Sequence, residues 1–157
     1  MNYRHGVSAF ILNDKKEFVM VLGLKKNLND PDYWKIPAGG VEKDEDSITA
    51  LKRELFEEIG ITENDYEIIG RSKYTDKFTW PKETSQRKFE KKSIWYDGQE
   101  REIFICKLHD SNFKFKLQEE EVAGIKWFNK NNYEPIILFP IQVEVMQKVI
   151  EEFKEYF

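Results

Sequence analysis

Residues 39–61 of this 157-residue chain read GGVEKDEDSITALKRELFEEIGI, and this stretch decides the fold that the sequence predicts. An α-helix turns by about 100° per residue, so residues three and four apart share a face. The apolar stripe of such a helix holds Ile48, Leu51, Leu55 and Ile59, and the opposite arc holds Arg53, Glu54, Glu57 and Glu58. This separation predicts an amphipathic helix whose apolar stripe packs on a core.

Both ends of the predicted helix carry residues that favour a helix terminus. Asp46 and Ser47 are good N-cap residues, and Gly60 is the residue type favoured just past a helix C-terminus. Before the helix, the paired glycines Gly39 and Gly40 let the backbone approach a ligand closely, so we expect them at a substrate site. The sequence therefore predicts a glycine loop followed by a helix that begins at residue 46 or 47.

The three glutamates of the arc need a counter-charge. Their Cβ atoms would lie about 5 to 6 Å apart, and like charges at this spacing destabilise a helix. A hard divalent cation removes the repulsion, and carboxylate oxygens suit Mg²⁺ or Mn²⁺. We therefore expect Glu54, Glu57 and Glu58 to bind Mg²⁺, for which Mn²⁺ can substitute. The alternative is an ordinary helix with a solvated acidic face.

Nine positions of the stretch follow the spacing G-x5-E-x7-R-E-U-x-E-E-x-G-U, where U is aliphatic. The residues that fill it are Gly39, Glu45, Arg53, Glu54, Leu55, Glu57, Glu58, Gly60 and Ile61. This spacing resembles the Nudix box without a departure. The resemblance implies an α+β fold, the Nudix αβα sandwich with a mixed sheet between helices, and a hydrolase of phosphoanhydride bonds. It also implies that the carbonyl of Ala38 is a metal ligand.

The chemistry of a phosphoanhydride sets the roles that we expect for the box residues. Its negative charges shield phosphorus from a nucleophile, so catalysis needs cations on the phosphate oxygens and a base for water. We expect Arg53 and Glu45 to orient the catalytic glutamates through a salt bridge, although a plain surface ion pair is the common alternative. The base is either one of the helix glutamates or a metal-bound hydroxide, and the sequence leaves both open.

Motifs outside the box resemble the family branch of bacterial RNA pyrophosphohydrolases and diadenosine polyphosphate hydrolases. They are Tyr3-Arg4, Trp34-Lys35-Ile36-Pro37, Tyr96-Asp97-Gly98-Gln99 and Glu121-Val122-Ala123-Gly124-Ile125-Lys126-Trp127. The resemblance implies substrate contacts from Arg4 and Gln99. It also implies a further metal ligand at Glu121, for which Glu119 or Glu120 would substitute after a small shift of the alignment.

One position departs from that branch. The RNA-type enzymes carry two basic residues after the phenylalanine that corresponds to Phe139, and this chain has Pro140 and Ile141 there. This departure weakens a direct transfer of RNA contacts from the family to this chain.

Residues 73–92 form a basic segment in an acidic chain. The segment has seven Lys or Arg against three Asp or Glu, whereas the whole chain has a formal net charge of −4. Its aromatic residues are Tyr74, Phe78, Trp80 and Phe89. Such interleaving suits base stacking and phosphate contact, but a solvated hairpin with aromatics in the core would look the same. We expect Arg87 and Lys88 to contact substrate, and Lys25 and Lys26 are either phosphate contacts or ordinary exposed lysines.

Length and composition indicate one domain over residues 1–157, because 40% hydrophobic residues can bury a substantial core. Strands are predicted over 6–12, 17–22, 66–73, 89–95, 102–108 and 124–128. A helix is predicted from Pro140, with Ile141, Val145, Val149 and Phe153 facing the core. Cys106 belongs to an apolar run and is expected in the core, and no chemistry is assigned to His5 or His109.

The N-terminus lacks an export signal, and no apolar stretch has the length of a membrane span. We therefore expect a cytoplasmic protein without a membrane partner. The first functional hypothesis is a Mg²⁺-dependent pyrophosphohydrolase of triphosphorylated RNA 5′ ends or dinucleoside polyphosphates. The second is a housecleaning hydrolase of free nucleoside triphosphates or nucleotide sugars. The third is a nucleotide-sensing or RNA-binding module without turnover, against which the intact acid set argues.

Overall fold

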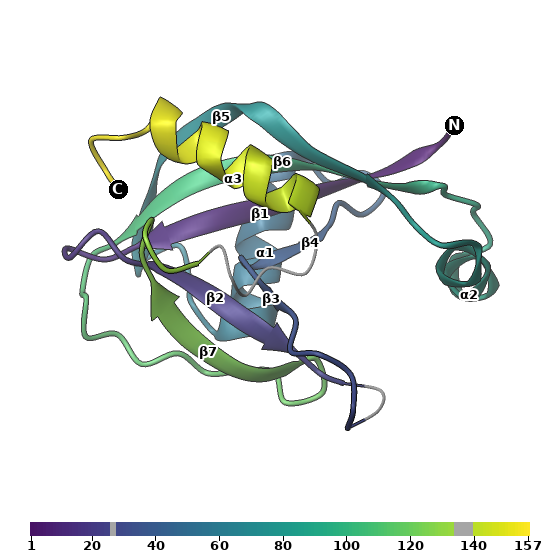
Figure 1. Ribbon diagram of the computed structural model, residues 1–157, viewed down its shortest axis with the longest axis horizontal. Helices are drawn as coiled ribbons and strands as arrows, with labels where there is room; N and C mark the ends of the chain where they lie inside the picture. Colours follow the sequence, from purple (N-terminus) through teal and green to yellow (C-terminus); the bar gives the residue numbers. More distant parts are fainter. Residues whose placement is uncertain (26–27, 134–139) are drawn as a thin grey trace.

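The computed structural model describes residues 1–25, 28–133 and 140–157, with the side chains of Pro140 and Ile141 left out (Figure 1). Its elements are β1 (Tyr3–Leu12), β2 (Phe18–Gly23), β3 (Trp34–Lys35), β4 (Ala38–Gly40), α1 (Ser47–Ile59), β5 (Tyr66–Thr79), α2 (Lys82–Lys92), β6 (Gly98–Leu108), β7 (Val122–Phe128) and α3 (Pro140–Glu152). The predicted core position Ile141 therefore lies outside the described side chains.

The strands form one mixed seven-stranded sheet. Its main order is β3-β2-β1-β6-β5, with β4 paired to β1 and β7 paired to β2. The first strand runs parallel to β6 from Tyr3 opposite Gly98 to Leu12 opposite Lys107. The β5–β6, β2–β7 and β1–β4 pairs are antiparallel. The chain must therefore cross from β1 to β6 through α1, β5 and α2.

Helices cover both faces of this sheet, as Figure 1 shows for α3 in front and α1 behind. The helix α1 buries Ala50, Leu51, Leu55 and Ile59 in one apolar cluster, to which Cys106 also belongs. The helix α3 buries Met146 and Val149 in a second cluster on the other face. The α+β fold and the αβα sandwich predicted from the sequence are confirmed.

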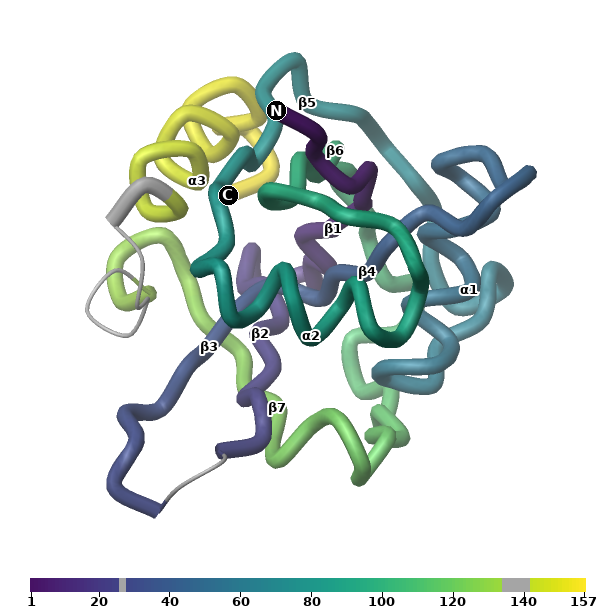
Figure 2. Tube along the Cα trace, turned by 90° about the vertical axis from the view of Figure 1, so that its right-hand side faces the viewer, coloured from purple at the N-terminus to yellow at the C-terminus, as the bar shows by residue number. Residues whose placement is uncertain are grey.

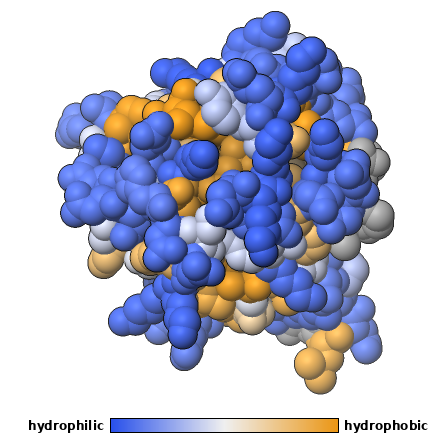
Figure 3. All heavy atoms as spheres, turned by 90° about the vertical axis from the view of Figure 1, so that its left-hand side faces the viewer, coloured by the Kyte–Doolittle hydropathy of each residue, from blue (hydrophilic) through white to orange (hydrophobic). Residues whose placement is uncertain are grey.

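The ends of the sheet differ in what covers them. Figure 2 shows α2 lying across one end of the sheet, between α1 on one side and α3 on the other. Figure 3 shows the opposite end, where hydrophilic side chains dominate and apolar atoms show between them. No helix in the described part of the chain is long and apolar enough to cross a membrane.

The two ends of the box helix carry the predicted capping residues. Asp46 is the N-cap, and its side chain accepts a hydrogen bond from the Thr49 backbone N–H at 2.7 Å. Gly60 ends the helix with φ of 75°, a left-handed conformation that glycine adopts without strain. Ile48 was expected in the core but is 38% exposed. It lies in the first turn, one turn before Leu51, where the helix has not yet reached the buried cluster.

The strand predicted over residues 89–95 is wrong, because Lys82–Lys92 form α2 and residues 93–97 are a connection to β6. Pro81 precedes a run of Lys, Glu, Gln and Arg without a β-branched residue except Thr84, and this composition favours a helix. The aromatic residues that suggested a strand pack on each other instead, with the Phe89 and Trp95 ring centroids 6.2 Å apart. The strand predicted from residue 66 also continues to Thr79.

Candidate active site

The predicted glycine loop is instead a short strand, because Ala38–Gly40 form β4, which pairs with β1 and lies against α1. Gly39 pairs with Val7 of β1, and a Cβ atom on Gly39 would collide with the Glu54 carboxylate. A Cβ atom on Gly40 would collide with the Arg4 guanidinium on the other side of the strand. Both glycines are thus needed for close approach, and the groups that approach them belong to the expected metal and substrate residues.

Arg53 is the hub of the acid cluster. Its Nε and Nη2 donate to the two Glu45 carboxylate oxygens at 2.8 and 2.9 Å, and Nη2 also donates to the Gly40 carbonyl at 2.9 Å. Its Nη1 donates to Glu54 at 2.8 Å and to Glu57 at 3.2 Å. The expected Arg53–Glu45 ion pair is present in bidentate form. The hydrogen bonds from Arg53 lower the pKa of Glu45 to about 2.

Glu58 does not share the exposed face that the sequence predicted for it. The side chain of Glu57 is 50% exposed, whereas Glu58 is 4% exposed and faces β4. Its Oε1 atom has no hydrogen-bond partner among the described residues, and the Ala38 backbone N–H is a partner of the carboxylate. Burial, and then the charges of Glu54 and Glu121, raise the pKa of Glu58 to about 7, against an opposing effect of Lys35.

The loop before β7 carries Glu121 to the same place. The Gln118 backbone N–H donates to the Glu58 carbonyl at 3.2 Å, and the Glu121 N–H donates to the Gln118 carbonyl at 3.0 Å. Of the three neighbouring glutamates, Glu121 is the one whose charge contributes to the raised pKa values of Glu54 and Glu58. Glu121 as a metal ligand stays a prediction.

The acid set fits a divalent cation in the kind of its donors. The oxygens of Glu54, Glu57, Glu58 and Glu121 are hard ligands, and the unpartnered Glu58 Oε1 is a buried acceptor that lacks a donor. In the arrangement described, however, Arg53 binds Glu54 and Glu57. No group of three or more Asp, Glu, His or Cys in the described ranges is gathered closely enough to hold a metal ion. Arg53 thus supplies the counter-charge here.

Lys35 is a residue of the site that sequence reasoning missed. It lies in β3, and burial lowers its pKa while the charges of Glu58, Glu54 and Glu121 oppose that shift. A single cation between the apolar residues Trp34 and Ile36, close before the glycine loop, was the available signal. A lysine in such surroundings needs a counter-charge from other elements.

A cleft of about 1000 Å³ lies between the end of the sheet and α2. Its lining includes Tyr3, Lys77, Phe78, Trp80, Lys88, Gln99 and Arg101. Cations stack on the aromatic rings: Lys88 lies 4.9 Å from the Trp80 centroid and Lys77 lies 4.5 Å from the Tyr3 centroid. Arg4 and Lys88 also line an adjoining hollow of about 80 Å³. The structure therefore brings Arg4, Lys88 and Gln99 together.

Other predicted substrate residues lie elsewhere. Arg87 is exposed and belongs to the lining of neither hollow. The Lys25 ammonium pairs with Asp32 at 2.6 Å, and Lys26 lies outside the described residues. Two of the segment's aromatic residues, Phe78 and Trp80, face the cleft. The other two do not, because Tyr74 packs on the α3 cluster and Phe89 packs on Trp95.

Comparison with known proteins agrees with this geometry. RNA pyrophosphohydrolase of Pelagibacter ubique is 32% identical over 97% of this chain and 92% of its own length. RNA pyrophosphohydrolase of Campylobacter jejuni subsp. doylei is 32% identical over 98% of this chain and 94% of its own.

Solved structures show the same fold. A binary complex of the C. elegans Ap4A hydrolase superposes with a TM-score of 0.69 at 18% identity, covering 97% of this chain and 99% of that one. The E. coli dihydroneopterin triphosphate pyrophosphohydrolase gives 0.68 at 17% identity, with the same coverage. The NUDIX domain matches residues 2–152. With its box on α1, its αβα layers and relatives of this similarity, the chain belongs to the NUDIX family of hydrolases.

Proposed function

We propose that this protein is a Mg²⁺-dependent pyrophosphohydrolase, active also with Mn²⁺, of 5′-triphosphorylated RNA ends or dinucleoside polyphosphates. The observation that carries the proposal is the buried, unpartnered Glu58 carboxylate oxygen, with Glu54 and Glu121 close by. A buried carboxylate without a donor is costly unless a cation or proton satisfies it. The basic, aromatic cleft at the same end of the molecule suits the nucleoside part of the substrate.

In this proposal, each residue of the site has a separate role in metal binding or orientation. A bound divalent cation supplies positive charge to the phosphate oxygens and lowers the pKa of water. Glu54, Glu57, Glu58, Glu121 and the Ala38 carbonyl would hold it. Arg53 keeps the acid side chains oriented through Glu45 and the Gly40 carbonyl. Without a cation, burial raises the pKa of Glu58 to about 7, and a bound cation would favour the ionised form that serves as a ligand.

The relatives support the substrate class. The similar proteins of P. ubique and C. jejuni bear the name RNA pyrophosphohydrolase and align along nearly the whole chain. In this chain, Arg4 and Lys88 line a hollow next to the cleft, where they would contact phosphates beyond the reacting end.

A substrate panel tests the proposal. Triphosphorylated RNA, dinucleoside polyphosphates, free nucleoside triphosphates and nucleotide sugars are compared by kcat/KM with Mg²⁺, and the products are resolved by anion-exchange chromatography. We expect one of the first two classes to exceed the others at least tenfold, and we expect EDTA to abolish turnover. Absence of turnover on every substrate, with either metal, would leave the non-catalytic module in place of the enzyme.

A second candidate, hydrolysis of free nucleotides or nucleotide sugars, is favoured by two observations. Pro140 and Ile141 stand where RNA-type enzymes carry basic residues, and Lys25 is already paired with Asp32. Both reduce the positive charge available to a long polyanion. A kcat/KM for free nucleotides or nucleotide sugars above that for triphosphorylated RNA and dinucleoside polyphosphates would select this candidate.

A further inference from the structure

Arg101 lies on β6, lines the cleft and is contacted by Gln99 and Phe78. Its Nη2 donates to the Gln99 side-chain oxygen at 3.3 Å, and its guanidinium stacks on Phe78 with 4.8 Å to the ring centroid. Its side chain is 13% exposed, yet the buried Nε has no hydrogen-bond partner among the described residues. Arg101 is therefore a pre-oriented cation whose hydrogen bonding is incomplete.

The carboxylate of Asp76 does not satisfy the remaining hydrogen-bond donors of Arg101. Asp76 faces Arg101 across the β5–β6 pair, and its Oδ2 lies 3.8 Å from Nη1. This distance allows an ion pair but not a hydrogen bond. The other oxygen, Oδ1, is buried and likewise has no partner in the described ranges. Nη1 of Arg101 therefore forms no hydrogen bond with Asp76 and can donate to a ligand in the cleft that Arg101 lines.

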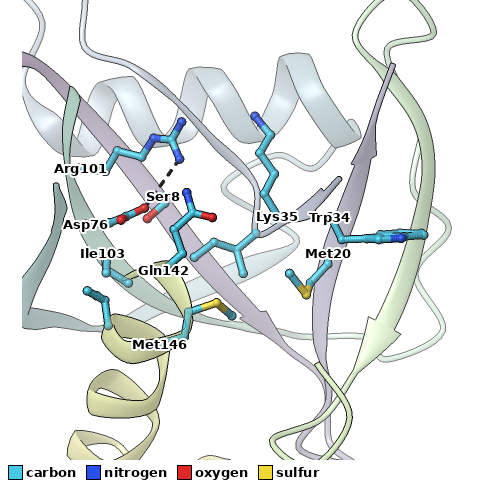
Figure 4. Close-up of a pocket in the computed structure, with 11 residues that line it drawn as sticks. Ser8, Met20, Trp34, Lys35, Asp76, Arg101, Ile103, Gln142 and Met146 are labelled. Carbon is cyan, nitrogen blue, oxygen red and sulfur yellow. Dashed lines mark ion pairs between the residues drawn. The ribbon is translucent and has the colours of Figure 1, made fainter. Parts of the chain in front are cut away.

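Lys35 continues the line of positive charge toward α1. Lys35 and Arg101 line the same small cavity of about 20 Å³, together with Ser8, Asp76 and Gln142. Figure 4 shows the Arg101 guanidinium and the Lys35 ammonium projecting to the same side of this cavity. Lys35 interacts electrostatically with Arg101 and with Glu58, Glu54 and Glu121. The two cations thus lie between the aromatic cleft and the acid cluster.

Lys35 and Arg101 are neighbouring cations beside Asp76 and the acid cluster, and an anion bound from the cleft would add a counter-charge that both can share. A phosphate group fits this role, because the guanidinium matches its oxygens through paired N–H donors and the ammonium acts as a point charge. In the proposed substrate, the nucleoside occupies the cleft and the reacting phosphorus faces the acid cluster. The polyphosphate chain then extends from the cleft to the acid cluster. Lys35 and Arg101 lie on that path.

We propose that Lys35 and Arg101 form an anion-binding pair that holds the polyphosphate chain of the substrate between the aromatic cleft and the acid cluster. This inference rests on the proposed function for the identity of the substrate. The pair binds and positions the substrate through its non-bridging phosphate oxygens, and it takes no part in proton transfer.

Inorganic tripolyphosphate is the probe for the pair. Its affinity is measured by calorimetry with EDTA present, for the wild type, Lys35→Gln, Arg101→Gln and the double variant. We expect at least a tenfold loss for each single variant, a shallower dependence of affinity on salt, and recovery in Lys35→Arg. Lys107→Gln is the matched control, because Lys107 is an exposed cation on the same strand as Arg101, and we expect its affinity to stay within twofold.

Steady-state kinetics on the best substrate of the panel separate binding from structure. We expect KM to rise at least tenfold in Lys35→Gln and in Arg101→Gln, with kcat changed less than threefold. Circular dichroism melts identify any variant that fails to fold, and the other single variant then carries the test. Unchanged tripolyphosphate affinity in the folded variants would overturn the pair, even if their melting temperature or kcat changed.

The two proposals can fail separately. If the wild type hydrolyses the panel while both variants keep its tripolyphosphate affinity and KM, the anion pair is wrong and the function stands. If the wild type hydrolyses no substrate of the panel, but Lys35→Gln and Arg101→Gln bind tripolyphosphate more weakly than the wild type does, the pair stands and the proposed reaction is wrong.

Discussion

At the scale of single residues, Glu58 departs most from the usual behaviour of its type. Glutamates on helices are normally solvated, but this one is 4% exposed and its pKa is raised to about 7. The unfolded chain ionises near its ordinary value of about 4.5. Between those values the folded state binds more protons than the unfolded state, so the stability contributed by this group falls as pH rises from about 4.5 to 7.

We predict that Glu58→Gln stabilises the metal-free protein at pH 8 but not near pH 5. A neutral amide avoids the cost of a buried charge, and the raised pKa of about 7 corresponds to a gain on the order of 3 kcal/mol. Urea unfolding in EDTA at both pH values measures it, in a range where Glu45, with its pKa of about 2, stays ionised. Parallel pH profiles of stability for the wild type and the variant would contradict the claim that Glu58 carries a buried charge.

We also expect Glu58→Gln to lose most of the hydrolase activity.

A second residue-scale prediction concerns Glu121. Glu121→Ala should lower turnover at least tenfold, or about 1.4 kcal/mol of transition-state stabilisation, because its carboxylate lies with Glu54 and Glu58. Glu119→Ala and Glu120→Ala are matched controls on the same loop and should change turnover less than threefold. A larger loss of turnover in either control would assign the metal ligand to Glu119 or Glu120 instead of Glu121.

At the scale of elements, α2 shows what the sequence pattern could and could not predict. The basic charge and the aromatic residues of segment 73–92 were visible, but a strand was predicted over residues 89–95 because Phe89 and Trp95 are strand-forming types. The helix arises from the Lys, Glu and Gln around Phe89, whose ring then packs on Trp95 across the following turn. The helix propensity of the surrounding residues therefore outweighs the strand propensity of the aromatic residues.

The helix also separates two neighbouring cations that the sequence treated alike. We predict that Lys88→Ala weakens binding of triphosphorylated RNA at least fivefold, because Lys88 stacks on Trp80 and lines both hollows. Arg87→Ala, its exposed neighbour, should have an effect below twofold. Each lost phosphate contact should reduce the slope of log affinity against log salt by about 0.7. Equal effects of the two substitutions would mean that α2 offers only a diffuse positive field.

The candidate site was predictable from the sequence only where it is local. The residues from Gly39 to Gly60 are close in the chain, so spacing and helix geometry sufficed to group them. Lys35, Asp76 and Arg101 come from three strands, and only the strand register of the folded sheet brings them to one cavity. The burial of Glu58 also required the packing of α1 on β4, which the helical pattern alone does not specify.

At the scale of the whole molecule, the acid cluster and the cleft are built on one seven-stranded sheet, so a cation that binds the native acids should stabilise the entire structure. We predict that saturating Mg²⁺ raises the melting temperature of the wild type, with a gain of about 1.4 kcal/mol at ten times the dissociation constant. Glu58→Gln should show a smaller rise, measured by scanning calorimetry with Ca²⁺-free buffers. An equal rise in both proteins would place the cation elsewhere.

The parallel pairing of β1 with β6 joins Tyr3 to Gly98 and continues to Leu12 opposite Lys107. During synthesis, the N-terminal strand leaves the ribosome long before its partner exists, and such distant contacts form slowly. The glycine loop and α1 can meet as soon as residue 60 has emerged, whereas the cleft has to wait for β6. The box residues of the acid end can therefore come together while β6 and Glu121 are still being translated, and the apolar first strand needs protection in the interval.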